Sequence, residues 1–175
     1  MGWLKMSEKV KHFLNRFQHE HNNKNDFRTP PYLFDFINKR YKIDYDGACE
    51  DGVNNLATPL RLEDYWPDFS IVYSNPPFDK DSILSWFHKG QDLAERGGIH
   101  IMLLPEKICQ VFFNPMIEHF SEIIFLGGRI NFISPYAVKG GSSMNGSIIT
   151  IQHHKKPALK ISGILLSELK RRYNE

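Results

Sequence analysis

The chain lacks the features that mark several classes of protein. Its two cysteines, Cys49 and Cys109, lie far apart and without metal-ligand spacing, which excludes a disulfide framework and favours a reducing cytoplasm. The N-terminus has no long apolar core, so we expect neither a signal peptide nor a membrane span. Charges of the two signs nearly balance at a formal net charge of +2, so composition alone does not require a polyanionic partner.

What is present is an ordinary globular composition. Hydrophobic residues make up 41% and aromatic residues 13% of 175 residues, enough for one domain with a real core. We expect an N-terminal helix and linker over residues 1–25 and the main domain over residues 26–175. The linker histidines His19 and His21 have no cysteine or carboxylate partner at suitable spacing, so no metal site is predicted.

Helical and strand patterns alternate along the chain. This alternation predicts a three-layer α/β sandwich with a mostly parallel sheet, in which ligands bind at the carboxyl ends of the strands. We expect a late antiparallel hairpin that pairs residues 130–133 with residues 147–152. The predicted helices cover residues 3–20, 29–41 (with Thr29 as N-cap and Pro30 at the first helical position), 81–95, 115–120 and 162–173, and the other strands cover 43–48, 71–74, 99–104 and 122–126.

The tetrapeptide Asn75-Pro76-Pro77-Phe78 follows the apolar run at 71–74. Pro77 restricts Pro76, so this turn is rigid and points an amide oxygen, a backbone carbonyl and an aromatic ring into one small space. Two acceptors can take both hydrogens of an aromatic amine and free its delocalised lone pair, while Phe78 stacks on the base. The turn therefore suits methylation of an exocyclic amine such as that of adenine. The alternative is a turn that simply ends a strand.

The chain resembles the phage-type DNA N-6-adenine methyltransferases, the Dam-like family, over roughly residues 26–152. The catalytic turn of that family corresponds to the tetrapeptide at 75–78. Four further boxes resemble the family in the same order: Asp26-Phe27-Arg28-Thr29-Pro30, Ile43-Asp44-Tyr45-Asp46-Gly47-Ala48-Cys49, Leu103-Leu104-Pro105 and Gly127-Gly128-Arg129-Ile130-Asn131-Phe132.

The resemblance implies a Rossmann-like methyltransferase fold that binds S-adenosylmethionine. Asp46 and Ala48 match the cofactor strand, and Asp64 matches an acidic position near the adenine of the cofactor. The family box also suggests a cofactor contact for Thr29 and Pro30. Each has a structural alternative: Asp46 as a loop carboxylate that caps a helix, Thr29 and Pro30 as a helix start, and Asp64 as a residue without a cofactor role.

Several positions depart from the family pattern. Phe27 stands where the family has Trp, and the glycine-rich loop of many methyltransferases is reduced to Gly47 and Gly52. The unit between the cofactor strand and the catalytic strand is compressed, and no segment is large enough for a separate target-recognition domain. We therefore expect a short recognition sequence, read by loops such as residues 134–146. Arg129 is a candidate for contacting phosphate or stabilising a loop, and a surface salt bridge is an equal alternative.

The implied substrate is DNA, with the target adenine flipped out of the duplex into the catalytic turn. The implied location is the cytoplasm of a bacterial host, for a protein encoded by a phage or prophage, and the state is monomer or dimer. The same turn also serves methyltransferases of RNA adenine or of protein glutamine. Two further alternatives stay open: a non-catalytic DNA-binding decoy, and a structural accessory of a larger assembly.

Overall fold

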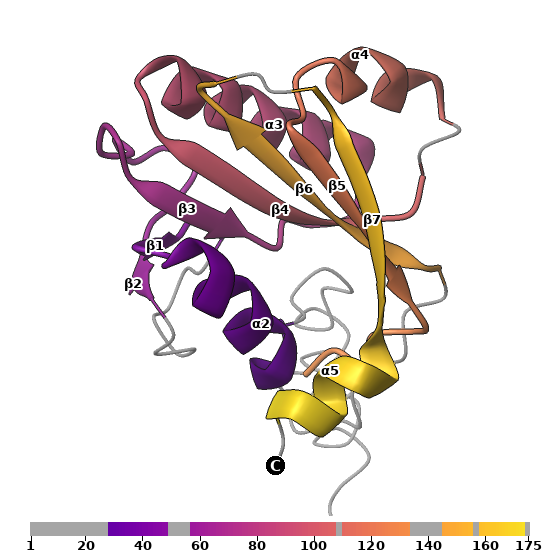
Figure 1. Ribbon diagram of the computed structural model, residues 1–175. Coiled ribbons are helices and arrows are strands. Elements are labelled where there is room, and N and C mark those ends of the chain that lie inside the picture. Colours follow the sequence, from indigo (N-terminus) through magenta and orange to yellow (C-terminus); the bar gives the residue numbers. More distant parts are fainter. Residues whose placement is uncertain (1–27, 49–56, 108–109, 134–144, 156–157, 174–175) are drawn as a thin grey trace, which may run out of the picture.

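The computed structural model describes residues 28–48, 57–107, 110–133, 145–155 and 158–173. Within these residues seven strands form a single sheet in the order β2-β1-β3-β4-β6-β5-β7 (Figure 1). The first four strands along the chain run parallel to one another, β6 is antiparallel to both its neighbours, and β7 runs parallel to β5. The strands are β1 (Tyr45–Asp46), β2 (Thr58–Pro59), β3 (Ile71–Ser74), β4 (Ile99–Pro105), β5 (Glu122–Gly127), β6 (Ser147–His153) and β7 (Lys160–Leu165).

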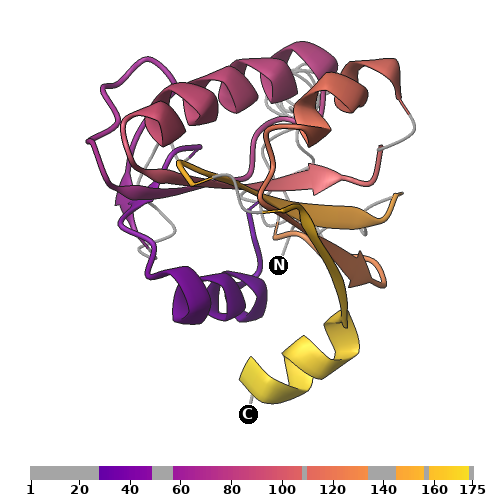
Figure 2. The same ribbon diagram turned by 45° about the horizontal axis from the view of Figure 1, so that its top comes forward.

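Helices cover both faces of the sheet, which confirms the predicted three-layer sandwich (Figure 2). On one face α2 (Pro31–Tyr41) and α5 (Leu166–Tyr173) enclose one part of the core. On the other, α3 (Lys80–Glu95) and α4 (Asn114–Ile117), which follows a short 3-10 helix, enclose a second part. The central strand β4 is buried on both sides, as its almost unbroken apolar run predicts.

The late antiparallel strand has a different partner from the predicted one. β6 pairs with β4 and with β5, whereas Ile133 forms an isolated bridge with Arg28. Residues 130–133 follow Gly128, whose φ of +117° turns the chain out of the sheet after β5. Ile130 and Phe132 then pack into the core from an irregular segment.

The helices predicted at 29–41 and 162–173 begin later in the structure. Residues 160–165 form strand β7, so the C-terminal helix begins at Leu166 and not at 162. The β-branched residues Ile161 and Ile164 suit a strand, and pairing with β5 outweighs the local helical spacing. At α2 the N-cap is Pro30 and the first helical residue is Pro31, and the Thr29 hydroxyl bonds elsewhere.

Some predictions fall outside the described residues, namely the helix at 3–20 and most of the loop at 134–146. No helix in the described ranges has the length and apolar character needed to cross a bilayer. The same ranges contain no group of three or more His, Cys, Asp or Glu side chains that could hold a metal ion.

Candidate active site

The turn at 75–78 leaves the carboxyl end of β3, between the neighbouring strands β1 and β4. Pro76 is buried, while Asn75, Pro77 and Phe78 are partly exposed. The turn is therefore anchored in the fold without being sealed inside it. This is the place in an open α/β sheet where ligands bind.

The aromatic residue of the turn packs against a second family box. The ring centroids of Phe78 and Phe132 lie 5.9 Å apart at an interplanar angle of 79°, an edge-to-face contact. Phe132 is buried, and its neighbour Ile133 exchanges two backbone hydrogen bonds with Arg28. The segments at 28–30, 75–78 and 130–133 thus come together at one end of the sheet.

Thr29 and Asp46 meet at Tyr73. The Thr29 hydroxyl lies 2.6 Å from the Tyr73 hydroxyl, and both residues are buried. Tyr73 is also the register partner of Asp46 across β3 and β1. Burial raises the pKa of Tyr73 far above its ordinary value, and the charge of Asp46 raises it further, so the phenol stays protonated. Two predicted cofactor residues are therefore joined through a residue that sequence analysis did not select.

The carboxyl group of Asp46 is buried. The residue is only 6% exposed, and its Oδ1 accepts a hydrogen bond of 3.2 Å from the Ala48 N–H. Burial raises the pKa of Asp46 to about 6, although the Ala48 bond opposes that shift. A desolvated carboxylate gains from a cationic or hydroxyl partner. S-adenosylmethionine carries a cationic amino group and ribose hydroxyls, so the Asp46 carboxylate fits this cofactor.

Gly47 forms a tight cradle beside Asp46. A Cβ atom at this position would lie 2.8 Å from Cζ2 of Trp66 and 2.9 Å from Cγ1 of Val72. Its N–H donates to the Tyr73 carbonyl at 2.7 Å, and its carbonyl accepts from the Trp86 indole at 3.2 Å. The backbone after β1 is thus fixed by β3 on one side and by α3 on the other.

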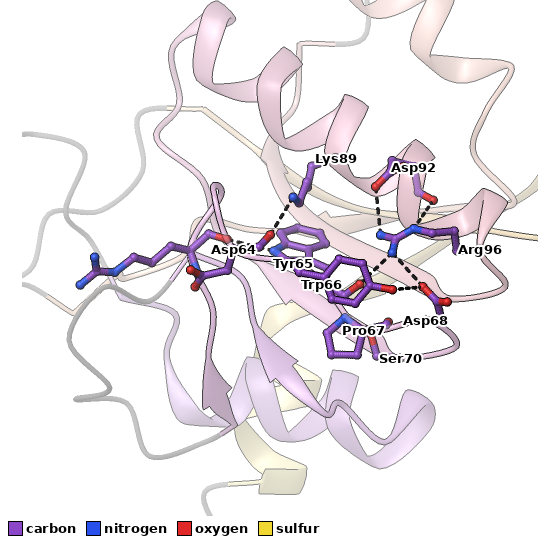
Figure 3. Close-up of polar contacts among 10 residues, drawn as sticks. Asp64, Tyr65, Trp66, Pro67, Asp68, Ser70, Lys89, Asp92 and Arg96 are labelled. Carbon is purple, nitrogen blue, oxygen red and sulfur yellow. Dashed lines mark hydrogen bonds and ion pairs between the residues drawn. The ribbon is translucent and has the colours of Figure 1, made fainter.

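Asp64 lies in the loop that leads to β3 (Figure 3). Its carboxylate accepts from the Arg61 N–H at 2.7 Å, and its backbone carbonyl accepts from Lys89 Nζ at 2.7 Å. These contacts close a turn and tie it to α3. A cofactor contact for Asp64 stays a prediction.

The rest of that loop is held by Arg96 at the end of α3 (Figure 3). Its guanidinium donates to the Trp66 carbonyl at 3.0 Å and forms ion pairs with Asp68 at 2.8 Å and Asp92 at 2.9 Å. The buried Trp66 ring then packs below α3. The loop thereby fixes the start of β3 and, through β3, the position of the turn at 75–78.

Sequence reasoning missed several residues around the turn. Tyr73 and Ser74 precede it directly, His100 interrupts the otherwise apolar strand β4, and Gln152 lies opposite His100 on β6. A polar residue within an apolar run is the signal that could have revealed them, because a buried polar group requires a partner.

A family model described as DNA N-6-adenine-methyltransferase (Dam) matches residues 17–174. The chain belongs to the Dam family. As a member of this family it is a DNA adenine methyltransferase, and its methyl donor is S-adenosylmethionine. No match was found among curated proteins.

A solved structure supports the fold of this Dam-family protein. One is a protein from Listeria monocytogenes described as a candidate class I S-adenosylmethionine-dependent methyltransferase, with a TM-score of 0.55 and 16% identity. The match covers 91% of this chain and 72% of that one. A predicted O-methyltransferase from Agrobacterium tumefaciens matches at a TM-score of 0.33 and 13% identity, covering 92% and 64%, a similarity too low to support an argument.

Proposed function

We propose that this protein methylates the exocyclic amine of an adenine that is flipped out of DNA into the turn Asn75-Pro76-Pro77-Phe78. The observation that carries the proposal is the partly exposed turn at the end of β3, one strand away from the buried carboxylate of Asp46. This arrangement supports the proposal, because the site proposed for the amine and the site proposed for the cofactor then lie at the same end of two neighbouring strands.

The residues at the end of β1 and before α2 would hold the cofactor. Asp46 would bind its amino group or ribose hydroxyls, supported by the Ala48 N–H that orients the carboxylate. Thr29 and Pro30 would line the same side, held by the bond from Thr29 to Tyr73. When bound, S-adenosylmethionine supplies an electrophilic methyl group.

The turn would orient the base. The side-chain oxygen of Asn75 and the carbonyl of Pro76 accept one amine hydrogen each, which makes the nitrogen lone pair available and stabilises the positive charge that develops on it. Phe78 stacks on the base, a contact worth about 1–3 kcal/mol that offsets part of the cost of flipping. The edge-to-face contact with Phe132 holds the Phe78 ring in place.

The test is sequencing, with detection of modified adenine, of DNA from cells that lack adenine methylation and express the protein. We expect methylated adenine at a recurring short sequence for the unmodified protein and none for Asn75→Ala. Asn75→Ala should keep its affinity for S-adenosylmethionine in a binding titration. The matched control is Asn114→Ala, an exposed asparagine at the start of α4, which should methylate as the unmodified protein does.

Two outcomes would contradict the proposal. Labelled methyl transfer to RNA or to protein glutamine, with unmodified DNA, would assign the turn to another substrate. Equal loss of cofactor binding and methylation in Asn75→Ala would show that Asn75 does not act on the amine.

A further inference from the structure

A buried chain of polar side chains lies behind the turn and crosses three strands. Ser74 is the last residue of β3, and its Oγ lies 2.8 Å from Nε2 of His100 on β4. Nδ1 of His100 lies 3.0 Å from Oε1 of Gln152 on β6. The Gln152 amide nitrogen then donates to the Phe87 carbonyl of α3 at 3.1 Å. Exposure of Ser74, His100 and Gln152 does not exceed 1%, so their bonds are shielded from water.

The direction of each hydrogen bond in this chain of side chains follows from the last acceptor, the Phe87 carbonyl. The Phe87 carbonyl can only accept, so the Gln152 amide nitrogen faces it and the Gln152 oxygen faces His100. His100 therefore carries its hydrogen on Nδ1 and leaves Nε2 as an acceptor. Ser74 must then donate its hydroxyl hydrogen to Nε2. One arrangement satisfies every member, and it fixes the rotation of the Ser74 hydroxyl.

His100 is held in a neutral form. Burial lowers the pKa of His100 to about 4, even though the Gln152 bond acts in the opposite direction. The Trp66 ring packs against the imidazole with centroids 5.0 Å apart. A neutral, buried and fully bonded imidazole does not exchange protons with a substrate near pH 7, so it acts through its position.

Helix α3 carries a glycine where it crosses this chain. A Cβ atom on Gly90 would collide with Nδ1 of His100 and with Oε1 of Gln152. Glycine inside a helix is less favourable than alanine, because its backbone loses more conformational freedom on folding. Gly90 therefore makes α3 less stable, but it leaves room for the His100 imidazole and the Gln152 amide directly beneath the helix.

We propose that His100 and Gln152 are positioning residues which, through Ser74, hold the turn at 75–78 in its reactive geometry. The inference rests on the proposed function of that turn. Ser74 is bonded covalently to Asn75, so a shift of Ser74 moves the Asn75 oxygen by a similar amount. A displacement of about 1 Å can cost a hundredfold in rate.

The experiment compares Ser74→Ala with Ser121→Ala. Ser121 is also buried, and its hydroxyl donates to the Ile151 carbonyl at 3.0 Å, next to the amino end of β5. Each variant removes one serine hydrogen bond, but only Ser74 touches the turn. With saturating cofactor and DNA, Ser74→Ala should lower the single-turnover methylation rate by about tenfold to a hundredfold. Ser121→Ala should stay within about twofold.

Two additional variants separate positioning from general destabilisation. Gln152→Met breaks the chain two hydrogen bonds away from the turn, and it should lower the rate as Ser74→Ala does. Ser74→Thr retains the hydroxyl and should recover most of the rate. Cofactor affinity should stay unchanged in all of them, because none of the substituted side chains forms a hydrogen bond with Thr29, Asp46 or Ala48.

Hydrogen exchange at the Asn75 and Phe78 amides gives a readout that does not need activity. Ser74→Ala should accelerate exchange at both amides, and Ser121→Ala should not. Equal rates and equal exchange in the two serine variants would overturn the inference, as would a parallel loss of cofactor affinity. Absence of DNA methylation by the unmodified protein would refute the proposed function, and the exchange comparison would still decide whether Ser74 holds the turn.

Discussion

Thr29 and Tyr73 share a hydrogen bond of 2.6 Å across 44 positions of sequence. The bond connects the segment before α2 to β3, and Tyr73 also packs edge-on against Phe34 of α2 at 5.5 Å. Tyr73 stands two residues before Asn75 in the chain. The segment proposed to hold the cofactor and the turn proposed to hold the base are therefore parts of one connected unit.

Tyr73→Phe tests this connection. Removing the hydroxyl frees the Thr29 side chain to rotate, and we expect affinity for S-adenosylmethionine to fall about threefold to tenfold, with a loss of about 1 kcal/mol in unfolding free energy. Calorimetric titration and chemical denaturation measure the two effects. The control is Tyr41→Phe, which removes a hydroxyl that donates to Glu122 at 2.8 Å. It should lose stability without losing cofactor affinity, and a similar affinity loss in both variants would refute the link.

The raised pKa of Asp46 predicts that cofactor binding depends on pH. Burial raises the pKa of Asp46 to about 6, and a positively charged or hydroxyl-bearing ligand favours the ionised form. Affinity for S-adenosylmethionine should therefore rise about tenfold between about pH 5 and pH 8, and level off above about pH 7. Titrations across this range measure the effect. Affinity that does not change with pH would remove Asp46 from the cofactor site.

The same carboxylate should lower the stability of the free protein. Folding favours the protonated acid, so the stability that Asp46 contributes is fully present below its unfolded pKa near 3.8 and is lost as pH rises through about 6. Asp46→Asn should therefore increase the free energy of unfolding near pH 7, by at most roughly 3 kcal/mol, while it weakens cofactor binding. Denaturation at about pH 4 should show little difference between the two proteins. A less stable Asp46→Asn at neutral pH would contradict this assignment.

Much of the fold was predictable because its signals are local. The helix predicted at 81–95 is α3, which begins one residue earlier at Lys80, where Asp79 caps it through a bond to the Ser82 N–H. The apolar run at 99–104 is strand β4. The turn at 75–78 was placed correctly at the end of a strand, because proline and asparagine mark turns in the sequence itself.

The remaining features depend on contacts between distant segments. Ile164, Leu165 and Leu169 fit a helical spacing, and only the pairing with β5 makes the first two part of a strand. The partner of β6 could not be chosen either, since β5 and the segment at 130–133 are both apolar and near in sequence. The polar chain behind the turn depends on register between β4 and β6, which one sequence does not reveal.

We expect Phe78 to contribute to DNA binding by stacking its ring on the flipped base. Phe78→Leu keeps an apolar side chain but loses stacking, so we expect productive affinity for DNA to fall about fivefold to 150-fold, while Phe78→Tyr retains most of it. A duplex with 2-aminopurine at the target adenine reports unstacking of the base by fluorescence. Phe125→Leu is the control, a half-buried phenylalanine that packs on the α3 and α4 side of the sheet. Equal effects of the two leucine substitutions would show that Phe78 only fills space.

Gly47 offers a test of how tightly the cofactor side of the site is built. Its φ does not lie in the left-handed region, so the cost of Gly47→Ala is steric: the new methyl would press on the buried Trp66 ring and on Val72. We expect a loss of about 1–3 kcal/mol in unfolding free energy and weaker binding of S-adenosylmethionine. Gly163→Ala on the edge strand β7 is the control, because a Cβ there meets its neighbours no closer than 3.6 Å. Urea denaturation and cofactor titration of both variants measure the difference. If Gly47→Ala is as stable and binds the cofactor as tightly as Gly163→Ala, the backbone after Asp46 can shift without cost and does not position the carboxylate.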